Sequence, residues 1–198
     1  MAYQRKDAFY ARAKAEGYRS RAAYKLLELA RRYQLLKRGD HVVDLGAWPG
    51  GWLQVAADLV GPRGIVVGID LVAVEPLPQA WVSTVVGDAG DPAVLEQLRE
   101  RCRGRVDVVL SDMAPKLSGV RDRDAARAAE LAEAAVAIAD QLVAPGGRLV
   151  MKVFSGAESE ALALARRVFT TAKLTKPESS RKESAEMYLI ATGRRGPS

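Results

Sequence analysis

The sequence predicts an α/β fold in which helices cover both faces of one mostly parallel sheet. Seven apolar runs of strand length alternate with helical stretches along the 198 residues, as expected for crossover connections between parallel strands. A glycine-rich turn follows the first run, at the place where open α/β sheets bind ligands. The composition, 48% hydrophobic and 27% charged, is ordinary for a globular domain.

The N-terminal region predicts a basic arm followed by an amphipathic helix. The arm covers residues 1–18 and ends at Gly17, and Ser20 is the expected N-cap of a helix that continues to about Leu36. Apolar residues recur in this helix at spacings of three and four, namely Ala22, Leu26, Leu29, Ala30 and Tyr33. We therefore divide the chain into an arm over 1–18 and a single domain over 19–198.

The alternation of strands and helices begins at residue 41. The predicted strands are 41–46, 64–70, 81–87, 106–111, 148–154, 171–176 and 186–192. The predicted helices are 50–60, 91–101, 122–143 and 157–169. A Pro-Gly-Gly turn is expected at 145–147, and a polar loop is expected between the last two strands.

The composition also excludes several classes of protein. A single cysteine, Cys102, excludes an internal disulfide framework and a cysteine-based metal site. A single histidine, His41, argues against a multi-histidine metal site, so we expect no metal. No apolar run is long enough to span a membrane, and the polar N-terminus is not a secretory signal. We therefore expect a cytoplasmic protein with no membrane partner.

The charge is unevenly distributed. Residues 1–40 carry 11 basic and 4 acidic residues and residues 166–198 carry 8 and 3, whereas residues 41–165 carry 11 and 17. Two basic ends that met in space would attract a polyanion such as a nucleic acid. The other interpretation is that these charges lie on solvated helix faces.

The glycine-rich turn over residues 44–52 is a candidate cofactor site. Its glycines, Gly46, Gly50 and Gly51, would let a ligand approach the backbone, and the following helix offers free N–H groups. The spacing G-x-x-x-G-G is not the G-x-G-x-x-G of dinucleotide-binding proteins.

Two acidic residues follow the next predicted strands. Asp70 could accept the hydroxyls of a ribose, and Asp88 could accept from an adenine amino group. Acids on both sides suit a cationic sulfonium nucleoside better than a pyrophosphate. Each could instead be a helix cap or turn residue.

Five motifs together resemble the FtsJ/RrmJ (RlmE) family. They are YRSRAAYKLLEL, VVDLGAWPGGW, SDMAPKLSG, APGGRLVMKVF and EMYLIATGR, in order from Tyr18 to Arg195. The resemblance implies a Rossmann-like methyltransferase that depends on S-adenosyl-L-methionine, with a seven-stranded sheet containing one antiparallel strand. It implies methylation of a uridine ribose 2′-hydroxyl in large-subunit (23S) ribosomal RNA, on the assembled or nearly assembled large ribosomal subunit.

The resemblance also assigns residues. The family's catalytic tetrad falls on Lys25, Asp112, Lys152 and Glu186. Its cofactor-binding residues fall on Gly50, Trp52, Asp70, Asp88 and Asp112. The chain departs from the family at Trp48, where a small residue is more common, and at Lys116, where Asn is expected.

The tetrad residues have alternative interpretations. Lys152 lies in an apolar run, so burial would favour its neutral form and suit it as a general base, while a nearby Asp112 would oppose this. Lys152 could instead extend to solvent from an edge strand. Lys25 could form an exposed pair with Glu28, and Glu186 alone would pass as a surface residue.

Other functions fit parts of the sequence. They are 2′-O-methylation of the transfer RNA anticodon loop or of messenger RNA caps, a non-catalytic RNA-binding ribosome assembly factor, and an NAD-dependent dehydrogenase. The compact length favours the ribosomal substrate, the intact tetrad argues against a pure binder, and the glycine spacing argues against the dehydrogenase. We expect a monomer.

RNA contacts are expected at the two basic ends. Candidates for phosphate contacts are Arg5, Lys6, Arg12, Arg19, Arg21, Arg181, Lys182, Arg194 and Arg195.

Overall fold

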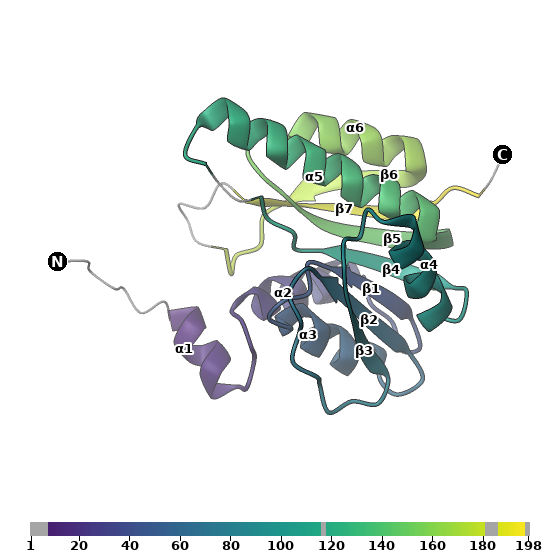
Figure 1. Ribbon diagram of the computed structural model, residues 1–198. Coiled ribbons are helices and arrows are strands. Elements are labelled where there is room, and N and C mark those ends of the chain that lie inside the picture. The colour runs from purple at the N-terminus through teal and green to yellow at the C-terminus, as the bar shows by residue number, and fades with distance from the viewer. Residues whose placement is uncertain (1–7, 116–117, 181–185, 197–198) are drawn as a thin grey trace.

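A computed structural model describes residues 8–115, 118–180 and 186–196. Within them, seven strands form one sheet in the order β3-β2-β1-β4-β5-β7-β6 (Figure 1). They are β1 (His41–Leu45), β2 (Ile65–Asp70), β3 (Val82–Val86), β4 (Val106–Ser111), β5 (Val143–Val153), β6 (Phe169–Thr175) and β7 (Met187–Arg194). Only β7 runs against its neighbours, pairing antiparallel with both β5 and β6. The predicted α/β fold with one antiparallel strand is confirmed.

Helices cover both faces of the sheet. One face packs against α2 (Ala22–Tyr33) and α3 (Gly51–Val60). The other packs against α4 (Pro92–Arg101), α5 (Arg121–Leu142) and α6 (Glu158–Val168). The remaining helix, α1 (Ala8–Ala15), lies to the side of the sheet (Figure 1), where the Tyr24 hydroxyl donates to Glu16 just beyond its end. The division of the chain at residue 18 stays a prediction.

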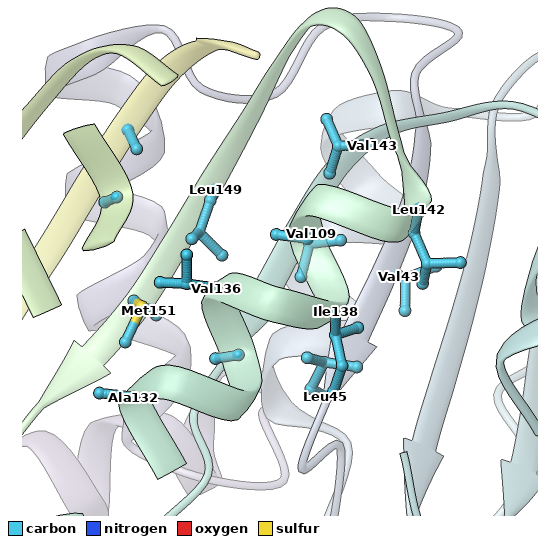
Figure 2. Packing of buried hydrophobic residues seen from close by; sticks show 14 of the residues in the cluster. Val43, Leu45, Val109, Ala132, Val136, Ile138, Leu142, Val143, Leu149 and Met151 are labelled. Atoms are coloured by element: carbon cyan, nitrogen blue, oxygen red, sulfur yellow. The ribbon is translucent and has the colours of Figure 1, made fainter. Parts of the chain in front are cut away.

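The core follows the two periodicities that the sequence carries. Val43 and Leu45 are two apart in β1, so both point to the face that α5 covers, where Val136 and Ile138 lie (Figure 2). Val42 points to the other face and belongs to the cluster beneath α2 and α3. Because both faces of the central strands are buried, these strands are mostly apolar, as parallel strands are.

The predicted cap and end of the first long helix were wrong. Arg21, not Ser20, precedes α2, and it has helical backbone angles and no capping side-chain bond. The Ser20 carbonyl instead accepts from the N–H of Ala23. The helix ends at Tyr33 because Gln34 adopts a left-handed conformation with φ of 51°.

The Pro-Gly-Gly segment also differs from the prediction. It lies inside β5 as an irregular stretch, not as a turn before the strand. Val106 pairs with Val143, and Val108 pairs with Arg148. Between these two pairs the chain advances five residues along β5 but only two along β4. Gly146 has φ of +81°, which a glycine adopts without strain.

Candidate functional site

A cavity of about 340 Å³ lies at the carboxyl ends of β1, β2 and β3, a size typical of small-molecule sites. Its lining residues are Gly46, Ile69, Asp70, Leu71, Gly87, Asp88, Ala89, Met113, Ala114 and Leu131. The structure therefore brings together three predicted cofactor residues, Gly46, Asp70 and Asp88. Asp112 immediately precedes the lining residue Met113.

The three glycines of the turn have different surroundings. Gly46 has φ of +74°, and a Cβ there would lie 2.9 Å from the Met113 side chain, so only glycine fits this wall of the cavity. A Cβ on Gly50 would lie 2.8 Å from Nη1 of Arg19, and one on Gly51 would collide with the Ser20 hydroxyl. Gly50 and Gly51 thus allow the chain before α2 to pack against α3, outside the cavity lining.

Trp52 is a buried structural contact. Its indole Nε1 donates to the carbonyl of Ala22 at 2.9 Å, and its ring centroid lies 6.0 Å from that of Tyr188. The ring therefore holds α3 against α2 and β7. It is not among the residues that line the cavity, so its cofactor role stays a prediction.

The two predicted acids shape the rim of the cavity. Asp70 accepts from the backbone N–H of Trp48 at 2.9 Å and of Val72 at 3.0 Å, one bond to each oxygen. Asp88 accepts from the N–H of Gly90 at 2.8 Å, which is an Asx turn. A carboxylate oxygen has two acceptor sites, so these local bonds still leave capacity for ligand hydroxyl and amino groups.

Asp44 is the first residue of the candidate turn, and sequence reasoning gave it no role of its own. It is fully buried in β1, and neither carboxyl oxygen has a hydrogen-bond partner among the described residues. Burial, and next the charges of Asp112 and Asp70, raise the pKa of this carboxyl well above its usual value. The available signal was an acid inside an apolar strand. A buried carboxyl without partners beside two further acids fits a ligand that brings positive charge.

The predicted tetrad forms two short ion pairs. Lys25 Nζ lies 2.6 Å from Glu186 Oε2, and Lys152 Nζ lies 3.0 Å from Asp112 Oδ1. Lys152 also donates to the backbone carbonyl of Asp112 at 2.8 Å. The side chains of the two lysines are 8% and 7% exposed, so both ammonium groups are largely withdrawn from solvent.

The structural alternatives for the two lysines were wrong. Lys25 pairs with Glu186, whereas Glu28 accepts from the backbone N–H groups of Glu178 and Ser179. Lys152 does not extend from an edge strand, because β5 lies between β4 and β7. The apolar sequence around Lys152 therefore reflects true burial.

Tyr188 joins the two pairs and was also missed. Its buried hydroxyl donates to Asp112 Oδ1 at 3.4 Å, and Lys25 Nζ lies 5.8 Å from its ring centroid. Burial, and next the charges of Asp112 and Glu186, raise the pKa of this phenol well above its usual value. The signal was present in the sequence, because Tyr188 is two residues after Glu186 and therefore points to the same side of the strand.

Within the described residues the two basic ends meet only in part. Helix α2 contacts the C-terminal region where Lys25 pairs with Glu186 and Glu28 accepts from the N–H of Glu178, but α1 and the end of β7 lie apart. In Figure 1, α1 lies on one side of the molecule and the end of β7 on the other. Arg19 donates to the carbonyls of Pro49, Glu75 and Pro76, and Arg194 pairs with Asp140 at 3.1 Å, so both hold the fold. The candidates Arg5, Lys6, Arg181 and Lys182, and the departure at Lys116, lie outside the described residues.

Two kinds of feature are absent from the described residues. No group of three or more histidine, cysteine, aspartate or glutamate side chains there could hold a metal ion. No helix there has the length and apolar character needed to cross a membrane.

Comparison with known proteins gives the family. The model of the FtsJ-like methyltransferase family matches residues 18–194. The chain belongs to this family. A relative from Methanothermobacter thermautotrophicus, named ribosomal RNA large subunit methyltransferase E, is 45% identical over 197 residues, which cover 99% of this chain and 93% of the relative. The resemblance found in the sequence motifs is confirmed.

Two solved structures resemble this family member. A Plasmodium falciparum protein described as a ribosomal RNA methyltransferase is 29% identical, with a TM-score of 0.79, and the match covers 91% of this chain and all of that one. Aeropyrum pernix fibrillarin, solved with bound S-adenosyl-L-methionine, is 20% identical with a TM-score of 0.62, covering 88% of this chain and 75% of fibrillarin. At that identity fibrillarin supports the fold alone.

Proposed function

We propose that this protein transfers a methyl group to a uridine ribose 2′-hydroxyl of large-subunit ribosomal RNA, on the assembled or nearly assembled subunit. The observation that carries the proposal is the pair of buried lysine–acid contacts, Lys25 with Glu186 and Lys152 with Asp112, of which Asp112 directly precedes the cavity residue Met113. The names of the relatives support the ribosomal substrate. The protein acts in the cytoplasm as a monomer, with residues 1–18 as an arm before a single domain.

The methyl donor is S-adenosyl-L-methionine, and the cavity fits it. Asp70 and Asp88 offer acceptors for its ribose and adenine, and the backbone beside Gly46 allows close approach. The partnerless carboxyl of Asp44 fits the positive charge of such a ligand. When bound, the donor supplies an activated methyl group with its own leaving group, so the protein's tasks are alignment and proton removal.

Lys152 is arranged to remove the proton of the ribose hydroxyl. Once the ammonium of Lys152 has lost a proton, its amine keeps two N–H groups, and Asp112 presents two acceptors to them, the backbone carbonyl and Oδ1. The nitrogen lone pair is then left for the hydroxyl. Once Lys152 takes the proton, the Asp112 carboxylate stabilises the resulting ammonium. Lys25, Glu186 and Tyr188 position the ribose.

The decisive experiment is transfer of labelled methyl groups to RNA. The purified protein is incubated with labelled S-adenosyl-L-methionine and large ribosomal subunits from a strain without its own enzyme of this family. Free 23S RNA and transfer RNA serve as parallel substrates, and Lys152→Ala is the negative control. We expect one labelled uridine ribose, with the subunit as the best substrate. Label on a base, label on transfer RNA alone, or no transfer would contradict the proposal.

A further inference from the structure

A second cavity lies at the opposite end of the sheet. It has a volume of about 690 Å³ and is formed where the segment after α3, the segment after α4 and the start of β3 meet. Its lining residues are Pro62, Arg63, Gly64, Ile65, Ala80, Trp81, Val82, Ser83, Arg101 and Arg103. Ile65 opens β2 and Asp70 closes it, so the two cavities are separated by about 17 Å of strand.

This cavity is strongly basic. Three arginines line it, Arg63, Arg101 and Arg103, and no acidic side chain does. All three are exposed, and within the described residues none of their guanidinium groups has a hydrogen bond or an ion pair. By contrast, the nearby Arg105 is paired with Asp107 at 2.7 Å. The cluster was hidden in the sequence because these arginines come from residues 41–165, whose net charge is negative.

Trp81 gives the cavity a rigid aromatic wall. Its indole Nε1 donates to the carbonyl of Ala57 at 3.2 Å, and its ring packs on the cluster beneath α3. The ring is therefore fixed in place while part of it borders the cavity beside Arg63 and Ser83. Nucleic-acid sites combine these two features, because cations hold the phosphates and an aromatic face stacks on a base.

We propose that this cavity binds a backbone phosphate of the RNA substrate, with the adjoining nucleotide against Trp81. Arginine suits this role because its planar guanidinium forms two parallel bonds to a phosphate and keeps its charge. The protein then binds RNA at two places. The methylated ribose lies at one end of the sheet, and a distant phosphate lies in the basic cavity at the other end. The inference rests on RNA being the substrate, and it does not depend on which atom is methylated.

The first test compares two double variants of equal charge change. The variant with Arg63→Gln and Arg103→Gln removes two positive charges from the cavity. Arg101 is kept because its charge stabilises the carboxyl end of α4. Arg166→Gln with Arg167→Gln removes two exposed arginines from α6, which packs beside β6 at the opposite edge of the sheet from β3. Binding to large ribosomal subunits is measured from 50 to 300 mM KCl. Affinity for S-adenosyl-L-methionine, measured by calorimetry, checks that each variant is folded.

We expect the cavity variant to bind subunits about tenfold more weakly at low salt and to lose about one unit of salt slope. The α6 variant should change less than twofold, and cofactor affinity should not change in either. Equal losses in both variants would mean that only overall charge matters, and no loss in the cavity variant would mean that its arginines are solvated surface. Either result would overturn the proposal, while leaving the methyl-transfer assay intact.

The second test locates the RNA and separates it from small anions. Cys102 is buried and burial raises the pKa of its thiol to about 12, so a new surface cysteine can be labelled selectively. A photoreactive probe on Ser83→Cys should cross-link to ribosomal RNA, whereas the same probe on Ala163→Cys of α6 should not. Inorganic phosphate at 10 mM should abolish neither cross-link nor binding. A cavity that binds phosphate but never cross-links to RNA would contradict the proposal.

Discussion

Lys152 and Tyr188 stand directly opposite each other in the antiparallel pairing of β5 with β7, and both reach the same oxygen of Asp112. Opposite residues of paired strands share one face of a sheet, so this register places an amine and a phenol around one carboxylate. Asp112 is thus fixed from two directions. The reversed direction of β7 makes this arrangement possible, because it brings the start of β7 to the end of β5.

Replacing Lys152 separates base catalysis from binding. Lys152→Ala should lower the single-turnover rate by about 10²–10⁴, the usual loss for a general base, while RNA and cofactor still bind. Lys152→Arg should not rescue the rate, because guanidinium stays protonated. A fully active Lys152→Arg enzyme would leave only an electrostatic role.

Tyr188→Phe tests the link between the two ion pairs. The 3.4 Å bond to Asp112 is long, so we expect a loss of less than tenfold in rate and about 1 kcal/mol in the free energy of unfolding. Tyr33→Phe is the matched control, because the Tyr33 hydroxyl bonds Thr175 at 2.9 Å away from the cavity. It should cost stability without lowering the rate. Equal rates in both variants would remove the positioning role of Tyr188.

Asp44 should make the cofactor-free protein less stable as the pH rises. Its carboxyl has a raised pKa in the folded state, so it is still protonated there when the unfolded chain has already ionised at about pH 4. The stability that Asp44 contributes is fully present below pH 4. It decreases as the pH rises from 4 to the pKa of the folded state, by up to about 1.4 kcal/mol per pH unit. The free energy of unfolding of wild type minus that of Asp44→Asn should therefore fall with pH between 4 and 8. A difference that does not change with pH would refute the buried, protonated state.

Asp70 and Asp88 should govern cofactor affinity. Asp70→Ala or Asp88→Ala should weaken S-adenosyl-L-methionine binding by at least ~1 kcal/mol, since a bound polar group loses its acceptor. The Asp70 variant should also loosen the loops at Trp48 and Val72. Calorimetry with Asp58→Ala, an exposed acid of α3, provides the control. Unchanged affinity in both variants would place the cofactor elsewhere.

Arg19 should affect stability more than RNA binding. Its guanidinium holds the carbonyls of Pro49, Glu75 and Pro76, so Arg19→Gln should lower the free energy of unfolding by about 1–2 kcal/mol. The salt dependence of RNA binding should stay as in wild type. If RNA binding by the variant depends less on salt while its stability is unchanged, Arg19 contacts an RNA phosphate instead of stabilising the fold.

Sequence periodicity and motifs predicted the sheet well because the central strands are mostly apolar on both faces, and because Gly46 and Gly87 directly follow β1 and β3. The errors in the predicted helix and turn boundaries occurred where the backbone adopts a conformation that the local amino-acid composition does not indicate. Gln34 ends α2 in a left-handed conformation although it is not a glycine, and Gly146 lies inside a strand instead of a turn. Such outcomes depend on tertiary contacts that a single sequence does not display.

The site was predicted unevenly for a similar reason. Lys25 and Glu186 are 161 residues apart in the chain and come into contact only in the folded sheet, where β7 pairs with β5. The family resemblance therefore identified them, because no local sequence pattern could. Asp44 and Tyr188 each had a local signal, an acid inside an apolar strand and a tyrosine two residues after Glu186, but both were interpreted as ordinary strand residues. The basic cavity at Arg63 and Arg103 could not be found from charge runs, because its members come from separate loops.

The strand order has a consequence for how the molecule is made. β7 lies between β5 and β6 in the sheet but follows both in the chain, so β6 leaves the ribosome before β7, its pairing partner among the described strands. Until β7 arrives, β5 and β6 each expose a bare edge, and the partner of Lys25 has not been synthesised. The Lys25–Glu186 pair can therefore form only after the start of β7 has been synthesised. A chain that ends before β7 lacks Glu186 and Tyr188, so the residues that we propose to position the ribose are incomplete until synthesis is nearly finished.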